Sequence, residues 1–212
     1  ANHEEVDVLD LVIRGGDVVD GTGAERVRAD VGVQDGTIVD VGRIGEKGRR
    51  EIDAEGCVVT PGFIDGHTHM DAQVFWDHLG SSSCWQGVTT VLMGNCGFTL
   101  APARDDARDL VVRSIERAED ISAAALAAGI DWTWQTFPEY LDAVERLPKA
   151  INYGASVGHS AVRAWVMGER AFEAEASGDE VDQMAAVVRE AMGAGAVGLT
   201  TTRNPVHLTR DD

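Results

Sequence analysis

The sequence predicts an α/β fold, in which a small antiparallel β-domain precedes a parallel sheet whose strands alternate with helices. Two observations lead to this fold class. In residues 1–60, apolar and polar positions alternate in short runs separated by turn pairs that contain glycine. After Pro61, β-branched apolar runs alternate with stretches in which apolar residues recur at helical spacing. Strands and helices in alternation form right-handed βαβ units, and these produce a parallel sheet.

The β-domain is predicted from three alternating runs: "DLVIRGGDVVDG", "ADVGVQDGTIVDVG" and "EIDAEGCVVTPG". Turn pairs interrupt these runs at hairpin spacing, namely Gly15-Gly16, Asp35-Gly36 and Glu55-Gly56. The clearest hairpin is "VGVQDGTIVDVG", where Asp-Gly separates two alternating runs. No cluster of catalytic residue types lies in this part of the sequence, so it predicts a structural sheet.

Four runs after Pro61 are predicted to be parallel strands. They are "GFIDGHTH" (62–69), "GVTTVLMGN" (87–95), "INYGASVG" (151–158) and "AVGLTTT" (196–202). The second run is apolar on both faces, which is typical of a strand covered by helices on either side.

Helices are predicted between and after these strands, over 104–119, 122–128, 136–147, 160–168 and 177–191. Two of them begin with a capping box, because Thr136 precedes Glu139, and Ser177 precedes Glu180, by three residues. Gly168 is predicted to end the helix "SAVRAWVMG".

Composition excludes several classes of protein. Among 212 residues, 44% are hydrophobic and no apolar run reaches the roughly 18 residues of a membrane-spanning helix. A formal charge of −18 argues against nucleic-acid binding, and three cysteines are too few for a disulfide scaffold. The acidic start "ANHEEVDVLD" lacks the layout of a signal peptide, so a cytoplasmic location is expected.

Ligand-type residues gather where two predicted strands end. Asp65, His67 and His69 alternate along the first strand and would share one face at its carboxyl end. Two imidazoles there suit a divalent metal such as zinc, and Asp65 could orient one of them. The His-x-His pair alone fits a polar turn equally well, but Cys96 ends the second strand and adds a third ligand type.

Several segments resemble the N-acyl-D-amino-acid deacylase (D-aminoacylase-like) branch of the amidohydrolase superfamily. "VVTPGFIDGHTHMDAQ" is similar to that family's first barrel strand and "GVTTVLMGNCGFTLAP" to its second. The segment from "DLVIRGG" to "VDVG" is similar to its N-terminal β-domain, and "GIDWTWQTFPEYLDAVE" and "SVGHSAVRAWVMG" to its middle section. The resemblance extends over essentially the whole chain.

The resemblance implies a metal-dependent (β/α)₈ TIM barrel with a small β-sandwich beside it. Residues 1–60 would be part of the sandwich, and residues 61–212 the first four β/α units of the barrel. Zinc would be the cofactor, with His67, His69 and Cys96 as ligands or beside it. Many amidohydrolases bind their metal with a carboxylated lysine on the fourth strand. That arrangement is not available here, because no lysine follows Lys149.

The activity that the resemblance implies is hydrolysis of an amide C–N bond in a small molecule, by hydroxide that zinc generates from water near neutral pH. The family's general acid/base aspartate has no counterpart in this sequence and is expected beyond residue 212. His159, Arg203 and His207 follow the third and fourth strands and are candidates for substrate binding, although His159 fits a structural role in capping a helix as well.

One segment of the sequence departs from the family's pattern, and this difference leaves alternatives to an acyl-D-amino acid substrate. The family's "GLIYP"-like stretch is replaced by "GLTTTRNPVH", so a cyclic imide, a ureido bond or another amide is also a candidate. A deaminase or lyase on the same fold, and an inactive barrel that serves as a binding scaffold, are rival functions.

A second polypeptide is the expected partner. A (β/α)₈ barrel has eight strands and takes roughly 250 residues. This sequence predicts four of those strands, which begin near residues 63, 88, 151 and 196. The last four strands would come from a separate chain or from cleavage of one precursor, at a polar site such as "HLTRDD".

Overall fold

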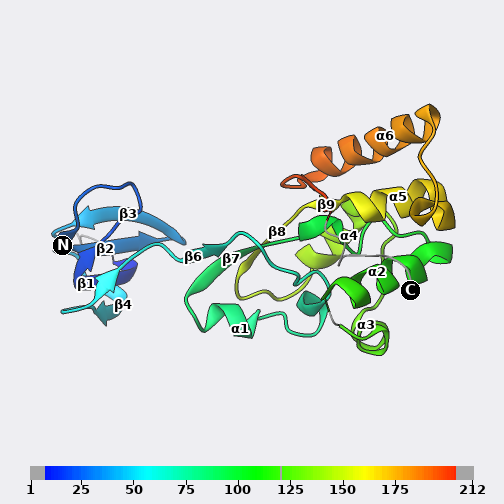
Figure 1. The fold of residues 1–212 in the computed structure, drawn as a ribbon. Helices are drawn as coiled ribbons and strands as arrows, with labels where there is room; N and C mark the ends of the chain where they lie inside the picture. The colour runs from blue at the N-terminus through cyan, green and yellow to red at the C-terminus, as the bar shows by residue number, and fades with distance from the viewer. Residues whose placement is uncertain (1–7, 120, 204–212) are drawn as a thin grey trace, which may run out of the picture. The chain divides into compact units, whose positions relative to one another are not determined.

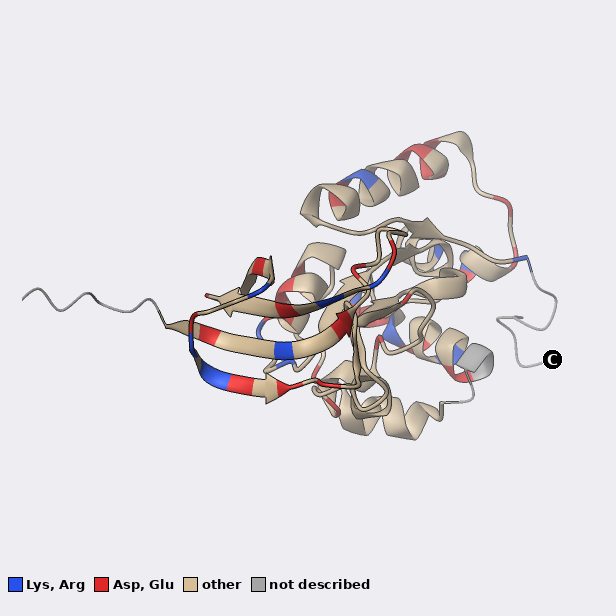
Figure 2. Cartoon of the chain, turned by 90° about the vertical axis from the view of Figure 1, so that its left-hand side faces the viewer, with Lys and Arg blue, Asp and Glu red and all other residues tan. Residues whose placement is uncertain are grey.

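A computed structural model describes residues 8–119 and 121–203 (Figure 1). The chain divides into two compact units, Ala1–Pro61 and Gly62–Asp212. Acidic and basic residues are spread over the strands and helices of both units (Figure 2). Among the described residues, no helix combines the length and the apolar character that crossing a membrane requires.

The first unit is a five-stranded sheet in which β3, β2, β1 and β4 are neighbours in that order and β5 also pairs with β1. Its strands are β1 (Leu9–Val18), β2 (Val27–Gln34), β3 (Thr37–Gly42), β4 (Gly48–Asp53) and β5 (Val58–Val59). β1 pairs antiparallel with β2 but parallel with β4 and β5. The expectation of a purely antiparallel sheet is therefore wrong. Between β3 and β4 the chain crosses from one edge of the sheet to the other, and both of these strands run in the same direction as β1.

The turn pairs predicted in this unit have different outcomes. Asp35 and Gly36 join β2 to β3, and both have positive φ angles, 51° and 72°. Positive φ at both central residues is the type I′ hairpin geometry that Asp-Gly favours. Gly15 and Gly16 instead lie inside β1, where the pairing with β2 shifts register between Ile13 and Gly16. This pair is a bulge rather than a turn.

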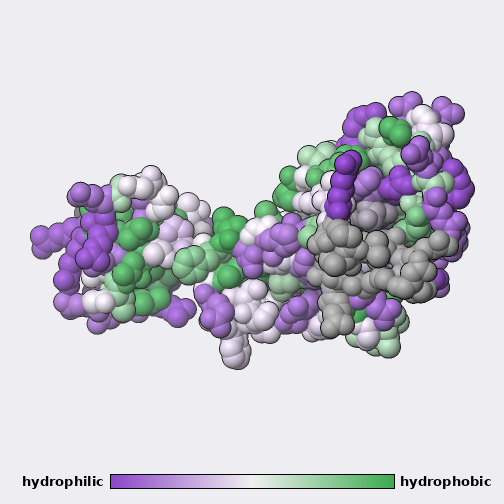
Figure 3. Space-filling model, in the orientation of Figure 1, coloured by the Kyte–Doolittle hydropathy of each residue, from purple (hydrophilic) through white to green (hydrophobic). Residues whose placement is uncertain are grey.

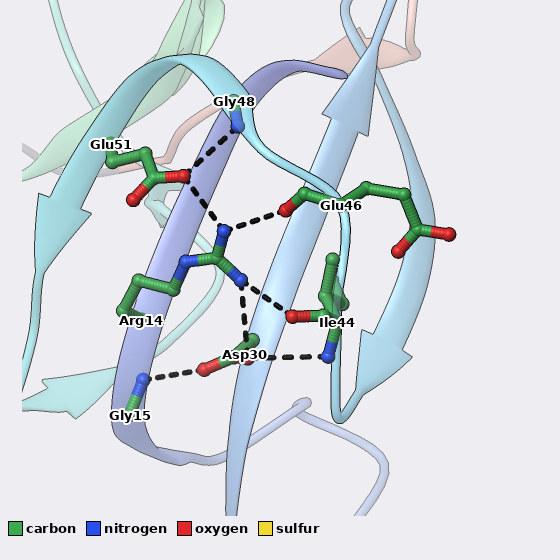
Figure 4. Close-up of polar contacts among 7 residues, drawn as sticks. All are labelled: Arg14, Gly15, Asp30, Ile44, Glu46, Gly48 and Glu51. Atoms are coloured by element: carbon green, nitrogen blue, oxygen red, sulfur yellow. Dashed lines mark hydrogen bonds and ion pairs between the residues drawn. The ribbon is translucent and has the colours of Figure 1, made fainter. Parts of the chain in front are cut away.

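A charged network centred on Arg14 joins the strands of this unit (Figure 4). The Arg14 guanidinium donates to Glu51 Oε1 at 2.7 Å and to the Ile44 carbonyl at 2.7 Å. Asp30 accepts the backbone N–H groups of Gly15 and Ile44, at 2.8 and 3.2 Å. These backbone hydrogen bonds, first that from Gly15, lower the pKa of Asp30. The network fixes the loop before β4 against β1 and β2.

The second unit is a mixed α/β fold with parallel strand pairing. Its strands are β6 (Phe63–Asp65), β7 (Val88–Met93), β8 (Asn152–Ala155), β9 (Val157–Gly158) and β10 (Leu199–Thr200). β6, β7 and β8 form one parallel sheet, and β9 and β10 form a parallel pair. The predicted positions of the four strands and their parallel direction are confirmed, whereas the pairing is divided between two sheets. The predicted third strand is interrupted at Ser156, which separates β8 from β9.

The helices of this unit agree closely with their predicted positions. The α-helices are α1 (Ser81–Cys84), α2 (Arg108–Glu119), α3 (Ala123–Gly129), α4 (Phe137–Glu145), α5 (His159–Met167) and α6 (Gly178–Ala194). Four short 3₁₀ turns accompany them: η1 (Gln73–Phe75), η2 (Asn95–Gly97), η3 (Asp105–Ala107) and η4 (Gly168–Phe172). Both capping boxes are present, at Thr136 and at Ser177. The sequence did not predict α1, η1, η2 or η4.

The core of the second unit lies between the strands and α2 to α6, and aromatic side chains fill its centre. Trp134, Phe137 and Tyr140 are almost completely buried. The Trp134 ring stacks on Phe75, with ring centroids 4.8 Å apart. Tyr140 donates to the Asp71 carbonyl at 3.0 Å, so α4 is attached to the loop that follows β6.

Candidate metal centre

Two histidines follow β6 in an irregular loop. The sequence predicted that the strand would include them, but β6 ends at Asp65, and His67 and His69 lie beyond it. Gly66 separates the strand from the loop, and Thr68 then bonds back to β7, donating its N–H to the Leu92 carbonyl at 2.9 Å. The imidazoles are therefore brought together by a loop fastened to β7. Strand alternation does not place them.

Cys96 lies in the tight 3₁₀ turn η2 after β7, which agrees with its predicted position at the end of a strand. Its φ angle is 55°, in the left-handed region that non-glycine residues seldom adopt. Such a conformation persists where the surrounding structure holds it. The turn is also crowded, because a Cβ added to Gly94 would lie 2.2 Å from the Ser156 carbonyl oxygen.

The three side chains form one cluster. Ligand atoms of His67, His69 and Cys96 all lie within 4.8 Å of one another. Cys96 Sγ is 3.5 Å from His67 Nε2, and the two imidazole rings meet edge to face with centroids 5.3 Å apart. His67 is exposed, whereas His69 and Cys96 are half-buried. Two imidazoles and a thiol at this separation form a donor set that could hold a divalent metal.

Residues that the sequence did not indicate hold the two halves of this cluster together. Asn95 Nδ2 donates to the carbonyls of Thr68 and Leu92, at 3.1 and 2.9 Å. Asp71 is 5% exposed and accepts the N–H of Gly94 through Oδ2 at 3.0 Å. The available signals were a polar residue two positions after His69 and another directly before Cys96, but neither has a spacing that identifies its hydrogen-bond partner.

The fourth strand reaches the cysteine turn from its other side. Thr200 in β10 donates its hydroxyl hydrogen to the Gly94 carbonyl and accepts the N–H of Gly97 at 3.2 Å. The turn that carries Cys96 is thus held between the loop after β6 and the strand β10. This contact spans more than 100 residues of sequence, so only the folded chain reveals it.

The other predicted site residues have different surroundings. Asp65 Oδ1 accepts the backbone N–H of His67 at 3.1 Å; its predicted role toward an imidazole stays a prediction. His159 begins α5, with Nδ1 3.0 Å from the Thr201 hydroxyl, and lines a largely apolar pocket of about 470 Å³ between α5 and α6. Arg203 is exposed. His207 lies outside the described residues.

Known proteins resemble this chain over most of its length. The sequence model of the Amidohydrolase family matches residues 50–212. The D-aminoacylase of Alcaligenes xylosoxydans xylosoxydans is 36% identical over 194 residues, and the match covers 91% of this chain and 37% of that protein. The N-acyl-D-glutamate deacylase of the same organism is 38% identical over 198 residues, with the same two coverages.

Solved structures agree with these matches. The crystal structure of N-acyl-D-glutamate deacylase from Bordetella bronchiseptica, complexed with zinc and a phosphonate inhibitor, superposes with a TM-score of 0.76 at 35% identity. That superposition covers 92% of this chain and 38% of the deacylase. The chain thus spans well under half the length of these relatives.

Proposed function

The chain belongs to the amidohydrolase family, and we propose that it supplies the metal-binding part of a hydrolase that cleaves a non-peptide amide C–N bond. The N-acyl-D-amino acids are the proposed substrate class. Support comes from relatives named for deacylation of D-amino acids, at 36% and 38% identity. The single observation that carries the proposal is the convergence of ligand atoms of His67, His69 and Cys96 to within 4.8 Å of one another.

Zinc is the proposed metal because the donor set fits it. Zinc accepts imidazole nitrogen at about 2.0–2.1 Å and thiolate sulfur at about 2.3 Å. In a tetrahedral site those bond lengths separate a nitrogen from a sulfur ligand by about 3.5 Å. Cys96 Sγ and His67 Nε2 lie 3.5 Å apart. Magnesium and calcium prefer oxygen ligands.

When bound, the ion would polarise the substrate carbonyl and make a water molecule acidic enough to react near neutral pH. The proposed role of His67, His69 and Cys96 is to hold it. His159 and Arg203 lie at the ends of the third and fourth strands and are the described candidates for contacting the substrate. The group that passes a proton to the leaving amine is expected on another segment of polypeptide.

A (β/α)₈ barrel completed by a further segment is the proposed architecture. β6 and β10 are the outer strands of the described parallel pairings, and both carry exposed apolar side chains. Ile64 is 69% exposed and Leu199 is 52% exposed. Figure 3 shows hydrophobic residues reaching the surface of this unit. The segment that covers them would belong to a longer chain or to a second polypeptide, as the greater length of the relatives suggests.

The test is a metal analysis combined with a substrate panel. The natural protein, with whatever further segments it carries, would be purified and its zinc content measured before and after treatment with a chelator. Chelation should abolish hydrolysis of N-acyl-D-amino acids, and added zinc should restore it. N-acyl-L-amino acids and cyclic imides in the same panel would define the substrate. A metal-loaded protein that is inactive on every amide would favour the binding-scaffold alternative.

A further inference from the structure

Asn95 occupies a position from which it reaches both segments that carry the candidate ligands. It directly precedes Cys96, and its side-chain amide donates to the carbonyl of Thr68, which lies between His67 and His69. We propose that Asn95 is a positioning residue for the metal centre, which sets the separation between the cysteine turn and the two histidines. This inference rests on the proposed metal site.

Both N–H groups of the amide have an assigned partner. Asn95 Nδ2 lies 3.1 Å from the Thr68 carbonyl oxygen and 2.9 Å from that of Leu92. A planar primary amide offers two donors from one nitrogen, so a single side chain satisfies both carbonyls. One carbonyl belongs to the histidine loop and the other to the end of β7.

The Leu92 carbonyl is the point where the loop and the strand meet. It also accepts the N–H of Thr68 and the Thr68 hydroxyl, each at 2.9 Å. Among the described residues, Thr68 takes part in three hydrogen bonds, and the one from Asn95 connects it to the cysteine turn. Loss of the amide would leave the histidine loop bonded to β7 but no longer bonded through Asn95 to the turn that carries Cys96.

The backbone around Cys96 needs such support. Cys96 has a φ of 55°, and a left-handed residue of this kind relies on its surroundings to keep its conformation. The two hydrogen bonds of the Asn95 side chain anchor the residue that immediately precedes Cys96. Partners that orient metal ligands typically contribute about 10- to 100-fold in metal affinity, and that range is expected here.

Two variants separate the hydrogen bonds from the volume of the side chain. Asn95→Ala removes both the amide and the space it fills, whereas Asn95→Leu keeps a similar shape without the N–H donors. Asn152→Ala is the matched control, because Asn152 Nδ2 donates to Thr90 Oγ1 at 3.3 Å between β8 and β7, and neither residue is a candidate ligand. All three would be made in the natural protein with its further segments.

Cobalt(II) is the probe, because a thiolate bound to cobalt gives a charge-transfer absorption in the near ultraviolet that reports on Cys96. Metal affinity would be measured by competition with a chelator of known strength, and thermal unfolding would be measured without metal. Both Asn95 variants should bind cobalt about 10- to 100-fold more weakly, with a weakened or displaced thiolate band. Asn152→Ala should bind as the parent does.

Two results would overturn the inference. In the first, both Asn95 variants keep the affinity and the thiolate band of the parent. In the second, both variants are unfolded without metal, so that Asn95 serves the fold as a whole. A parent protein that binds no cobalt through a thiolate would overturn the proposed metal centre itself, and the inference with it. This outcome is distinguishable from the other two because it is seen in the parent protein, before any substitution is made.

Discussion

Cys96 is the residue whose replacement tests the metal centre most directly. Replacing it by alanine should reduce zinc affinity by more than the roughly 10- to 100-fold expected for losing a partner of a ligand, because a ligand itself is lost. Activity should fall with the metal. The measurement is zinc content by elemental analysis, together with turnover of an N-acyl-D-amino acid.

Cys84→Ala is the matched control for this change. Cys84 is a half-buried cysteine of the same unit, and it lies outside the His67, His69 and Cys96 cluster. It should keep the zinc content of the parent. Full zinc occupancy in the Cys96 variant would show that the thiol is not a ligand.

The lowered pKa of His159 predicts that the stability of the protein depends on pH. Partial desolvation of its ring, and then the positive charge of Arg163, lower its pKa from the ordinary value of 6.5. Between that value and the lower pKa of the folded state, the unfolded chain binds more protons than the folded one, so stability falls as the pH falls. Urea unfolding of the natural protein at several pH values below 6.5 should show this loss, and His159→Gln should reduce its slope. An unchanged slope in that variant would assign the effect to other groups.

At the scale of the element, α4 depends on its capping box. Thr136 Oγ1 accepts the N–H of Glu139, and Glu139 Oε2 in return accepts the N–H of Thr136 at 2.9 Å. Hydrogen bonds from the backbone of Thr136 and Gln135 lower the pKa of Glu139. These bonds satisfy groups at the helix start that would otherwise lack partners.

Thr136→Ala should therefore lower the free energy of unfolding by about 1 kcal/mol, measured by urea denaturation of the natural protein. Thr133→Ala is the control, because Thr133 is exposed and precedes the helix; a change within about 0.5 kcal/mol is expected for such a surface position. Equal losses in the two variants would mean that the cap does not stabilise α4.

At the scale of the whole molecule, the exposed apolar side chains of β6 and β10 predict that residues 1–212 do not act alone. Phe63 is 63% exposed and Ile64 is 69% exposed, and unpaired edges of this kind favour association. The 212-residue chain expressed by itself should self-associate and fail to hydrolyse amides. Expression together with the further segment should give a defined assembly with activity.

Size-exclusion chromatography and denaturing mass spectrometry would check this prediction. Active material should contain either a longer chain or a companion polypeptide. A lone, monomeric species of 22.6 kDa that hydrolyses amides would contradict it.

The sequence determined most of the helices and strands and the candidate ligand residues, because these depend on local chemistry. Capping residues at Thr136 and Ser177 specify helix starts by bonds three residues apart. Asp35-Gly36 specifies its hairpin because both residues tolerate positive φ. The residues His67, His69 and Cys96 were identifiable because each follows an apolar run that had to be a strand.

Only the tertiary structure decided how those candidate ligand residues come together and what holds them there. Asn95 and Thr68 are 27 positions apart, and Thr200 contacts the cysteine turn from more than 100 residues away. No periodicity encodes such pairs, because each hydrogen bond depends on where the packing of β7 and β10 places two backbones. The same reason explains why the bulge at Gly15-Gly16 and the parallel pairing of β4 were not foreseen. Both depend on which strands become neighbours, and long-range contacts decide that.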